Sequence, residues 1–426
     1  MFSRVLGVLE IHRTESGDLH PKLARYQLRY TSKYSRITVY QICEGLSRAF
    51  GGFVAHFAPV WRWGRGWRWR YVKKNLTNWC GRVKIEVTKV TKNDVRGTKM
   101  EKIMDKIYKI AIDVMGSDKG PQMMVEGALK ALEANVDMGV VLVGDREAIN
   151  AALTGAGEYD AERVEIIEAA DIITNYDNPA EAIMRKRDSS LVMALDALKR
   201  RDDIVGLINA GSTGALLVGS AVYLPTPDRQ RPALAAVLPA ERGGYVCLVD
   251  TGANIDCSAA QLHAFGVMGA QFMRDLYGIE NPKVGLLSNG AEETKGNKLV
   301  KETHQLLKAD ESLNFVGNIE GTNALSGDCD VLVADGFAGN QVLKNTEGIA
   351  KRIIKDIVKY AKKTDNPEIM KLVGHLMSMY DFNSLGGAVV LGVSKPVIKA
   401  HGAANADSIV STSKMILNIA KNKAVF

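Results

Sequence analysis

The chain has 426 residues, of which 46% are hydrophobic and 24% are charged, and its formal net charge is +7. This length accommodates two domains or one large α/β domain with appendages, and the apolar content is ordinary for a globular protein. Because no run of about 18 apolar residues occurs, a membrane-spanning helix is not expected.

The first hundred residues differ in composition from the rest. They contain 20 Lys and Arg against 6 Asp and Glu, and all five tryptophans, whereas the remainder contains 35 basic and 42 acidic residues. We interpret residues 1–105 as a basic, Trp/Arg-rich extension, disordered or non-native, with the true start at Met100 or Met104. A targeting extension is one alternative. A nucleic-acid or membrane module is another, because Trp61–Arg70 alternates aromatic and cationic side chains.

From Lys109 onward, short apolar runs alternate with helical patterns. The apolar runs predict strands, and the segments between them predict helices. In the first half, strands are expected at 109–115, 139–144, 163–168 and 204–209, and helices are expected after Pro121, at 146–153, at 179–200 and from Gly211.

The second half repeats this alternation. Strands are expected at 234–238, 245–249, 283–287, 314–316 and 330–334, and helices at 259–277, 298–308, 341–363 and after Pro367. Such a pattern predicts a largely parallel sheet that helices cover on both faces.

Five polar turns follow predicted strands and are rich in glycine and small polar residues. Ligands of such sheets bind beyond the carboxyl ends of the strands, so the turns are expected to converge on one crevice. Glycine permits close backbone approach and left-handed turns, which form anion-binding nests, so a phosphate-sized anion is the predicted ligand. The five turns are 113–121, 211–214, 250–254, 288–297 and 335–340.

The turn that contains Lys295 lies between a predicted strand and a helix that begins near Lys298. A helix N-terminus favours negative charge, and a lysine beside a glycine, here Gly296, adds a full positive charge. The segment therefore suits a bound anion, although an ordinary solvated loop is the alternative interpretation.

Several chemistries have no signature in this sequence. The five cysteines form no CxxC motif, which is typical of a reduced, cytosolic protein. Because HExxH, GxSxG, GxxxxGK[ST] and GxGxxG are all absent, no metal, serine acyl-enzyme, nucleotide or other cofactor is predicted. His401 is interpreted as a structural histidine, with a supporting role near the crevice as the alternative.

A helical hairpin is expected at about 341–380. Ile349, Ile353 and Ile357 form a stripe on its first helix, with lysines beside them, and the second helix is also rich in apolar residues. An apolar stripe with basic flanks suits an anionic membrane surface. Ordinary packing, including packing in a dimer, is the alternative.

Taken together, the motifs of the polar turns are specific. They resemble those of the bacterial phosphate acyltransferases, the acyl-acyl-carrier-protein:phosphate acyltransferases of phospholipid synthesis, from about Lys106 to the C-terminus. The motifs, in order, are 112–116 (IDVMG), 209–215 (NAGSTGA), 231–234 (RPAL), 250–256 (DTGANID), 295–297 (KGN), 317–320 (GNIE), 335–340 (DGFAGN) and 398–402 (IKAHG).

The resemblance implies a three-layer α/β/α homodimer with a fold like those of isopropylmalate dehydrogenases and phosphotransacetylases. It implies transfer of a fatty acyl group from acyl carrier protein to inorganic phosphate. It also implies Lys295 and Asn340 as the catalytic pair. The expected phosphate and substrate contacts are Asp113, Gly211, Ser212, Thr213, Gly214, Gly252, Asn254, Asn297, Asp335 and Gly339, with backbone N–H groups of the turns as additional donors.

The resemblance further implies a cytoplasmic protein that works at the membrane surface, next to the downstream glycerol-3-phosphate acyltransferase. The acidic carrier protein needs a basic surface, for which Arg185, Lys186 and Arg187 are candidates. The sequence departs from the family pattern at Ser117, Lys119, Ser212, residues 288–291 and Leu385. A phosphotransacetylase acting on coenzyme A thioesters is the main alternative enzyme, and a β-decarboxylating dehydrogenase is a weaker one.

Overall fold

The computed structural model describes four stretches of the main part of the chain and two strands nearer the N-terminus. The four stretches are residues 107–226, 230–379, 387–402 and 404–422. The chain divides into two compact units, Met1–Asp105 and Lys106–Phe426.

In the first unit, β1 (Leu6–Ile11) and β2 (Ile85–Val90) pair antiparallel along their whole length. The interpretation of residues 1–105 as a basic extension that is disordered or non-native stays a prediction. The Trp61–Arg70 segment, Met100 and Met104 lie outside the described residues.

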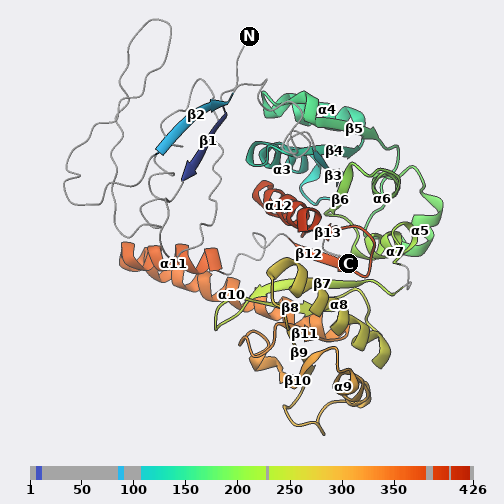
Figure 1. Cartoon of the computed structure of the whole chain (residues 1–426), viewed down its shortest axis with the longest axis vertical. Coiled ribbons are helices and arrows are strands. Elements are labelled where there is room, and N and C mark those ends of the chain that lie inside the picture. The colour runs from blue at the N-terminus through green and yellow to red at the C-terminus, as the bar shows by residue number, and fades with distance from the viewer. Residues whose placement is uncertain are drawn as a thin grey trace, which may run out of the picture. The chain divides into compact units, whose positions relative to one another are not determined.

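The second unit is built on one eleven-stranded sheet (Figure 1). Neighbouring strands are parallel except around β7 and β12, so the sheet is mostly parallel, as predicted. The order across the sheet is β10 (Asn314–Glu320), β9 (Lys283–Ser288), β11 (Val331–Val333), β8 (Tyr245–Val249), β7 (Ala233–Pro239), β12 (Ala388–Leu391), β13 (Val397–Lys399), β6 (Ile204–Asn209), β3 (Tyr108–Asp113), β4 (Met138–Gly144) and β5 (Val164–Glu168).

The strand direction reverses in the middle of the sheet. β7 and β12 are each antiparallel to both of their neighbours, so β3, β4, β5, β6 and β13 run one way and β8, β9, β10 and β11 run the other way. The turns after β3 and β6 therefore leave the sheet at one edge, and those after β8, β9 and β11 leave it at the opposite edge. The five polar turns therefore form two groups at opposite edges; that the turns meet in one crevice stays a prediction.

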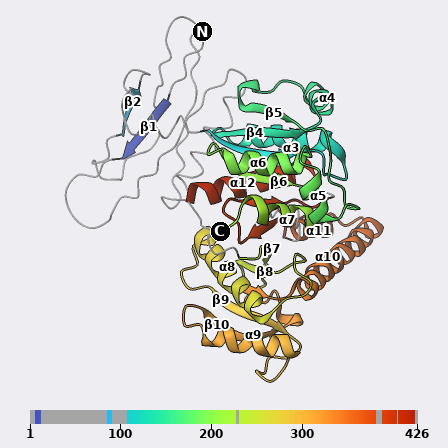
Figure 2. The same ribbon diagram turned by 90° about the vertical axis from the view of Figure 1, so that its right-hand side faces the viewer.

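Residues alternate between two buried faces along each strand. Ile110 and Ile112 pack under one helical layer, and Ala111 between them packs under the other. The first layer contains α3 (Gly120–Ala134), α4 (Arg146–Ala156), α8 (Ala259–Tyr277), α9 (Lys298–Ala309) and α12 (Ala406–Asn422). The second contains α5 (Pro179–Arg185), α6 (Ser190–Arg200), α7 (Thr213–Tyr223) and α10 (Gly336–Thr364). Figure 2 shows α8 and α10 on opposite sides of β7 and β8, and the three-layer α/β/α prediction is confirmed.

The single helix predicted at 179–200 is in fact two helices, α5 and α6. The intervening backbone bonds to the chain after β5 instead of continuing the helix, since the Asp188 carbonyl accepts from the N–H groups of Ala170 and Asp171. Ser189 Oγ also donates to the Lys186 carbonyl at 2.7 Å, which closes a turn between the two helices.

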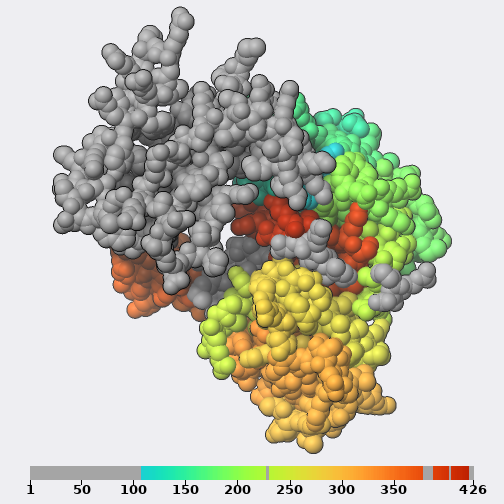
Figure 3. Space-filling model, in the orientation of Figure 1, coloured from blue at the N-terminus to red at the C-terminus, as the bar shows by residue number. Residues whose placement is uncertain are grey.

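Two central strands, β12 and β13, have no counterpart in the sequence prediction. They are only four and three residues long, too short for a clear period. They connect the two parallel blocks, because β13 pairs with β6 and β12 pairs with β7. Figure 3 shows the C-terminal part of the chain, in red, between the green first half and the yellow second half.

The predicted hairpin consists of α10 and α11 (Pro367–Met379). α10 begins at Gly336, five residues earlier than expected, so the 335–340 motif is the N-cap and first turn of a helix and not a loop. Asp365, in the left-handed conformation, ends α10, and Tyr380 lies outside the described residues.

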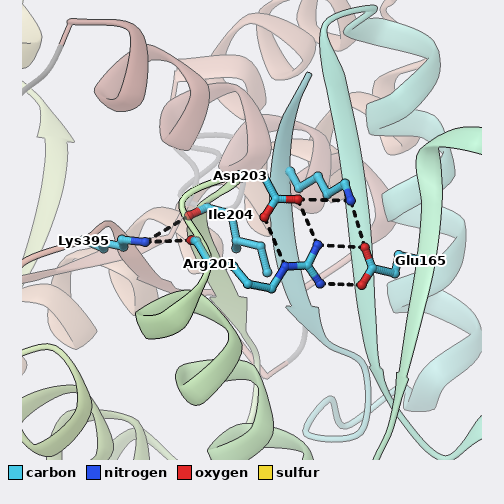
Figure 4. A network of polar contacts seen from close by, with 6 residues as sticks. Glu165, Arg201, Asp203, Ile204 and Lys395 are labelled. Atoms are coloured by element: carbon cyan, nitrogen blue, oxygen red, sulfur yellow. Dashed lines mark hydrogen bonds and ion pairs between the residues drawn. The ribbon is translucent and has the colours of Figure 1, made fainter. Parts of the chain in front are cut away.

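A charged network joins the amino ends of β3, β5 and β6 (Figure 4). Glu165 accepts from Lys109 at 2.9 Å and from both terminal nitrogens of Arg201, which also bonds to Asp203. The Arg201 guanidinium lowers the pKa of Glu165 to about 2. Because the polar turns after β3 and β6 leave the opposite edge, we regard this network as structural.

Candidate active site

The turns after β3 and β6 are joined by a buried pair of side chains. Asp113 lies in register with Asn209, whose Nδ2 donates to Asp113 Oδ2 at 2.7 Å. The N–H of Met115 and the hydroxyl of Ser190 also donate to Asp113, while Asn209 Oδ1 accepts from the N–H of Gly211 at 3.0 Å. Burial raises the pKa of Asp113, although these donors oppose the shift. Asp113 therefore organises both turns from beneath the surface.

The turn after β6 leads directly into α7. Ser212 caps this helix, because its Oγ accepts from the N–H of Ala215 at 3.4 Å. The N–H groups of Thr213 and Gly214 belong to the first helical turn, which has no intrahelical acceptors, and no other acceptor is bonded to them within the described chain. They are therefore available to an anion, as the sequence predicts for this turn.

The end of β13 belongs to the same group. The N–H of Ala400 donates to the Asn209 carbonyl at 2.8 Å. Lys399 Nζ donates to the carbonyls of Ala210 at 3.1 Å and Ala400 at 2.6 Å. Burial is the main reason why the pKa of Lys399 is lowered to about 8 and the pKa of His401 is also lowered. A half-buried cation thus lies next to the Gly211–Gly214 turn.

The turn after β8 is organised by the buried Asp250. Its carboxylate accepts from the N–H groups of Gly252, Ala253 and Asn254 at 3.1, 3.0 and 2.7 Å. Burial raises the pKa of Asp250 against the effect of these donors. Because the Asp250 carboxylate already accepts from these amides, their predicted contact with phosphate would have to compete with it. The Asn254 side-chain amide also has acceptors within the chain, because its Nδ2 donates to Asp250 and to the Pro232 carbonyl.

The N-terminal end of α10 packs against the Asp250 turn. Asp335 caps it by accepting from the N–H of Ala338 at 2.8 Å. A Cβ on Gly339 would lie only 1.9 Å from the Asp250 carbonyl oxygen, so this close approach requires glycine. The contact places Asn340 beside Gly252, where a Cβ would lie 3.7 Å from the Asn340 side chain. The half-buried Asn340 amide is therefore held at the surface of the turn.

Lys295 lies on the turn after β9, and β9 is the neighbour of β11 in the sheet. The N–H of Lys295 donates to the Glu292 carbonyl at 3.0 Å, and the same carbonyl accepts from Asn318 Nδ2 on β10. Asn297 caps α9 through the N–H of Val300, so this predicted substrate contact has a structural role. Lys295 itself is exposed, and its ammonium forms no hydrogen bond or ion pair within the described chain.

Lys295 and Asn340 follow the parallel neighbours β9 and β11, and therefore lie at the same edge of the sheet. α10 connects this edge to the other group of turns. Lys344, one helical turn after Asn340 and about 6 Å further along the axis, influences the pKa values of Lys399 and His401. Within three turns, α10 thus passes from the Asp250 turn to the end of β13.

Sequence reasoning missed two charged groups that this arrangement brings together, Lys399 and Lys344. The signal for Lys399 was present in the 398–402 motif, where only His401 was considered. Lys344 had no signal, because a lysine on an amphipathic helix is usually solvated; here it pairs with the buried Glu347 at 3.1 Å.

The described residues contain no group of three or more His, Cys, Asp or Glu able to hold a metal ion. Of the basic residues considered for the carrier protein, Lys186 is committed to Asp177 at 3.2 Å and to the Ile172 carbonyl at 2.8 Å. Arg185 pairs with Glu181, whereas Arg187 is exposed.

Comparison with known proteins agrees with this architecture. One solved structure, a phosphotransacetylase from Streptococcus pyogenes, superposes with a TM-score of 0.52 at 17% identity, covering 78% of this chain and 99% of that chain. This likeness concerns the fold.

Sequence relatives are much closer. The phosphate acyltransferase of Caldanaerobacter subterraneus is 39% identical over 320 residues, which are 74% of this chain and 94% of that protein. The phosphate acyltransferase of Ligilactobacillus salivarius is 40% identical over 327 residues, 74% of this chain and 95% of that protein. Residues 108–423 match the family described as fatty acid synthesis protein. The chain therefore belongs to this family and, within it, to the phosphate acyltransferases.

Proposed function

We propose that the chain transfers a fatty acyl group from acyl carrier protein to inorganic phosphate, giving acyl phosphate for phosphatidic acid and phospholipid synthesis. The observation that carries the proposal is the docking of Asn340 on the Asp250 turn, at the same sheet edge as the uncommitted ammonium of Lys295. Relatives about 40% identical along nearly their whole length are named phosphate acyltransferase, which supports this reaction.

In this reaction a phosphate oxygen attacks the thioester carbonyl. A C–O bond forms, the C–S bond breaks, and the carrier thiolate leaves and takes up a proton. Phosphate is already nucleophilic at neutral pH, so the protein needs to align two reactants and stabilise an oxyanion. Lys295 binds phosphate and offsets the developing charge, and the Asn340 amide donates to phosphate or to the thioester oxygen.

The backbone donors of the site are those of α7 and not those of the Asp250 turn. Thr213 and Gly214 have free N–H groups, whereas Asp250 occupies those of residues 252–254. We place the reactants along the Asn340–Lys344 side of α10, between the two groups of turns.

The direct test uses purified full-length protein with long-chain acyl carrier protein and inorganic phosphate, and traps acyl phosphate with hydroxylamine. We expect product from the wild type and a loss of two to three orders of magnitude in Asn340→Ala. Asn345→Ala, at an exposed position of the same helix, is the matched control. Product from coenzyme A thioesters alone favours the phosphotransacetylase alternative, and no product from either substrate refutes the proposal.

The α10–α11 hairpin is the proposed contact with the membrane surface and the downstream glycerol-3-phosphate acyltransferase. Within the described residues no helix is long and apolar enough to cross a bilayer. The hairpin nevertheless exposes several large apolar side chains, a composition that suits an interfacial helix. These are Ile349, Ile353, Tyr360, Met370, Leu372 and Met377.

The remaining partners are the carrier protein and a second copy of the chain. We propose that the acidic carrier docks near Arg187, which is exposed, whereas Lys186 is occupied by its own loop. Homodimer formation is proposed from the family resemblance, and size-exclusion chromatography with light scattering tests it.

A further inference from the structure

Two lysines at the ends of β13 form the same kind of contact in different places. Lys395 Nζ donates to the carbonyls of Leu198 and Arg201 at 2.7 and 2.8 Å and so closes the C-terminal end of α6. Figure 4 shows the Lys395 contact with the Arg201 carbonyl beside the charged network, at the amino ends of the strands. Lys399, at the other end of β13, also donates to two backbone carbonyls, but it does so beside the polar turns.

The Lys399 contacts hold one specific peptide group. Asn209 is fixed on its own side by Asp113 and by the N–H of Ala400. Ala210 follows, and among the described residues the donor to its carbonyl is Lys399 Nζ. Loss of this donor removes one of the contacts that fix the link between Asn209 and the Gly211–Gly214 turn, in which the N–H groups of Thr213 and Gly214 are the available donors.

The charge of Lys399 has no direct counterion in the described chain. Its charged neighbours are Asp118, from the turn after β3, and Lys344, from α10, which act on its pKa in opposite directions. Two of the three ammonium hydrogens are used by Ala210 and Ala400. A bound anion is therefore the favourable partner for the remaining charge.

We propose that Lys399 is a positioning residue for acyl transfer to phosphate: its protonated ammonium holds the Ala210 and Ala400 carbonyls, and thereby aims the N–H groups of Thr213 and Gly214 at phosphate. This inference rests on the proposed function, and it adds a charge requirement at the end of β13. Burial lowers the pKa of Lys399 to about 8, so the requirement is visible near neutral pH.

The test compares Lys399→Met and Lys399→Arg with Lys395→Met as the matched control. We measure kcat and KM for phosphate across a pH range centred on 8. We expect Lys399→Met to lower kcat/KM about 100-fold, because a displacement of about 1 Å in a reacting group costs this much. Lys395→Met is expected to lower the melting temperature while keeping the wild-type KM and pH profile.

The pH profile distinguishes positioning by charge from simple packing. The wild-type kcat/KM is expected to fall as pH rises through about 8, and Lys399→Arg is expected to move this fall to higher pH because guanidinium stays protonated. Ionisation of phosphate itself is common to both proteins and cancels in their ratio. Identical profiles for the wild type and Lys399→Arg overturn the proposal. If Lys399→Met does not fold, the comparison of the wild-type and Lys399→Arg pH profiles tests the proposal by itself.

A binding measurement separates this inference from the proposed function. Inorganic phosphate alone is expected to raise the melting temperature of the wild type and Lys395→Met, and to raise that of Lys399→Met much less. An equal rise in Lys399→Met overturns the role of Lys399 even if acyl phosphate is made. If the wild type makes no acyl phosphate, the proposed function fails, while the thermal shift still decides whether Lys399 supports phosphate binding.

Discussion

Gly339 marks the closest approach between α10 and the Asp250 turn, and its replacement by alanine tests the docking of Asn340. A Cβ at this position would lie 1.9 Å from the Asp250 carbonyl oxygen, whereas real Cβ atoms do not come closer than 3.0 Å, so the backbones must separate by about 1.1 Å. Such overpacking costs about 1–3 kcal/mol. A glycine-to-alanine change inside a helix otherwise gains about 1 kcal/mol.

Gly339→Ala is therefore expected to destabilise the protein by up to about 2 kcal/mol. Because Asn340 is the next residue, we also expect kcat for acyl phosphate formation to fall about 100-fold. Gly348→Ala is the control in the same helix, since nothing lies within 4 Å of its added Cβ. It should gain about 1 kcal/mol and keep full activity.

Urea denaturation measures the stability of both variants, and hydroxylamine trapping measures their product. If Gly339→Ala is as stable and as active as Gly348→Ala, the close contact between α10 and the Asp250 turn does not exist in solution. The role proposed for Asn340 then loses its structural basis.

Three further predictions concern the turn that contains Lys295, the charged network and the hairpin. Lys295→Ala is expected to lower kcat by about two to three orders of magnitude at unchanged melting temperature, with the exposed Lys298→Ala as control; near-normal turnover of Lys295→Ala would exclude its assigned role. Because the pKa of Glu165 falls from 4.5 to about 2 on folding, its stabilisation is complete above pH 4.5 and is lost as pH falls toward 2. Glu165→Gln should thus flatten this part of the acid-denaturation profile, and an unchanged profile would contradict the network. Replacing both Ile349 and Ile353, 61% and 52% exposed, by Asp is expected to reduce sedimentation with anionic vesicles while turnover in solution persists; a change in oligomeric state alone would instead assign this face to a dimer.

Secondary structure and layering were largely predictable because they depend on local periodicity. Both faces of the sheet are buried, so strands such as β4 appear as continuous apolar runs bounded by glycine or polar residues. The break between α5 and α6 was not predictable, since the Asp188 carbonyl is used by Ala170 and Asp171 from an earlier segment.

The residues of the candidate site were proposed from sequence, but their arrangement could not be. Lys295 and Asn340 were assigned from the family resemblance, and the structure leaves the first exposed and the second half-buried beside Gly252. The sequence could not show that Asp250 consumes the amides of its own turn. An amide is available or occupied only through its partners, and these are set by the folded backbone.

The sequence by itself determined which segments become strands and helices, which side chains they bury, and which turns carry glycine and polar residues. Only the tertiary structure decided the direction of the strands relative to one another. β7 and β12, more than 140 residues apart along the chain, pair in the centre of the sheet and reverse its direction. Side chains alternate between the two faces of the sheet in parallel and antiparallel strands alike, so long-range pairing alone separates the polar turns into two groups and makes α10 their connection.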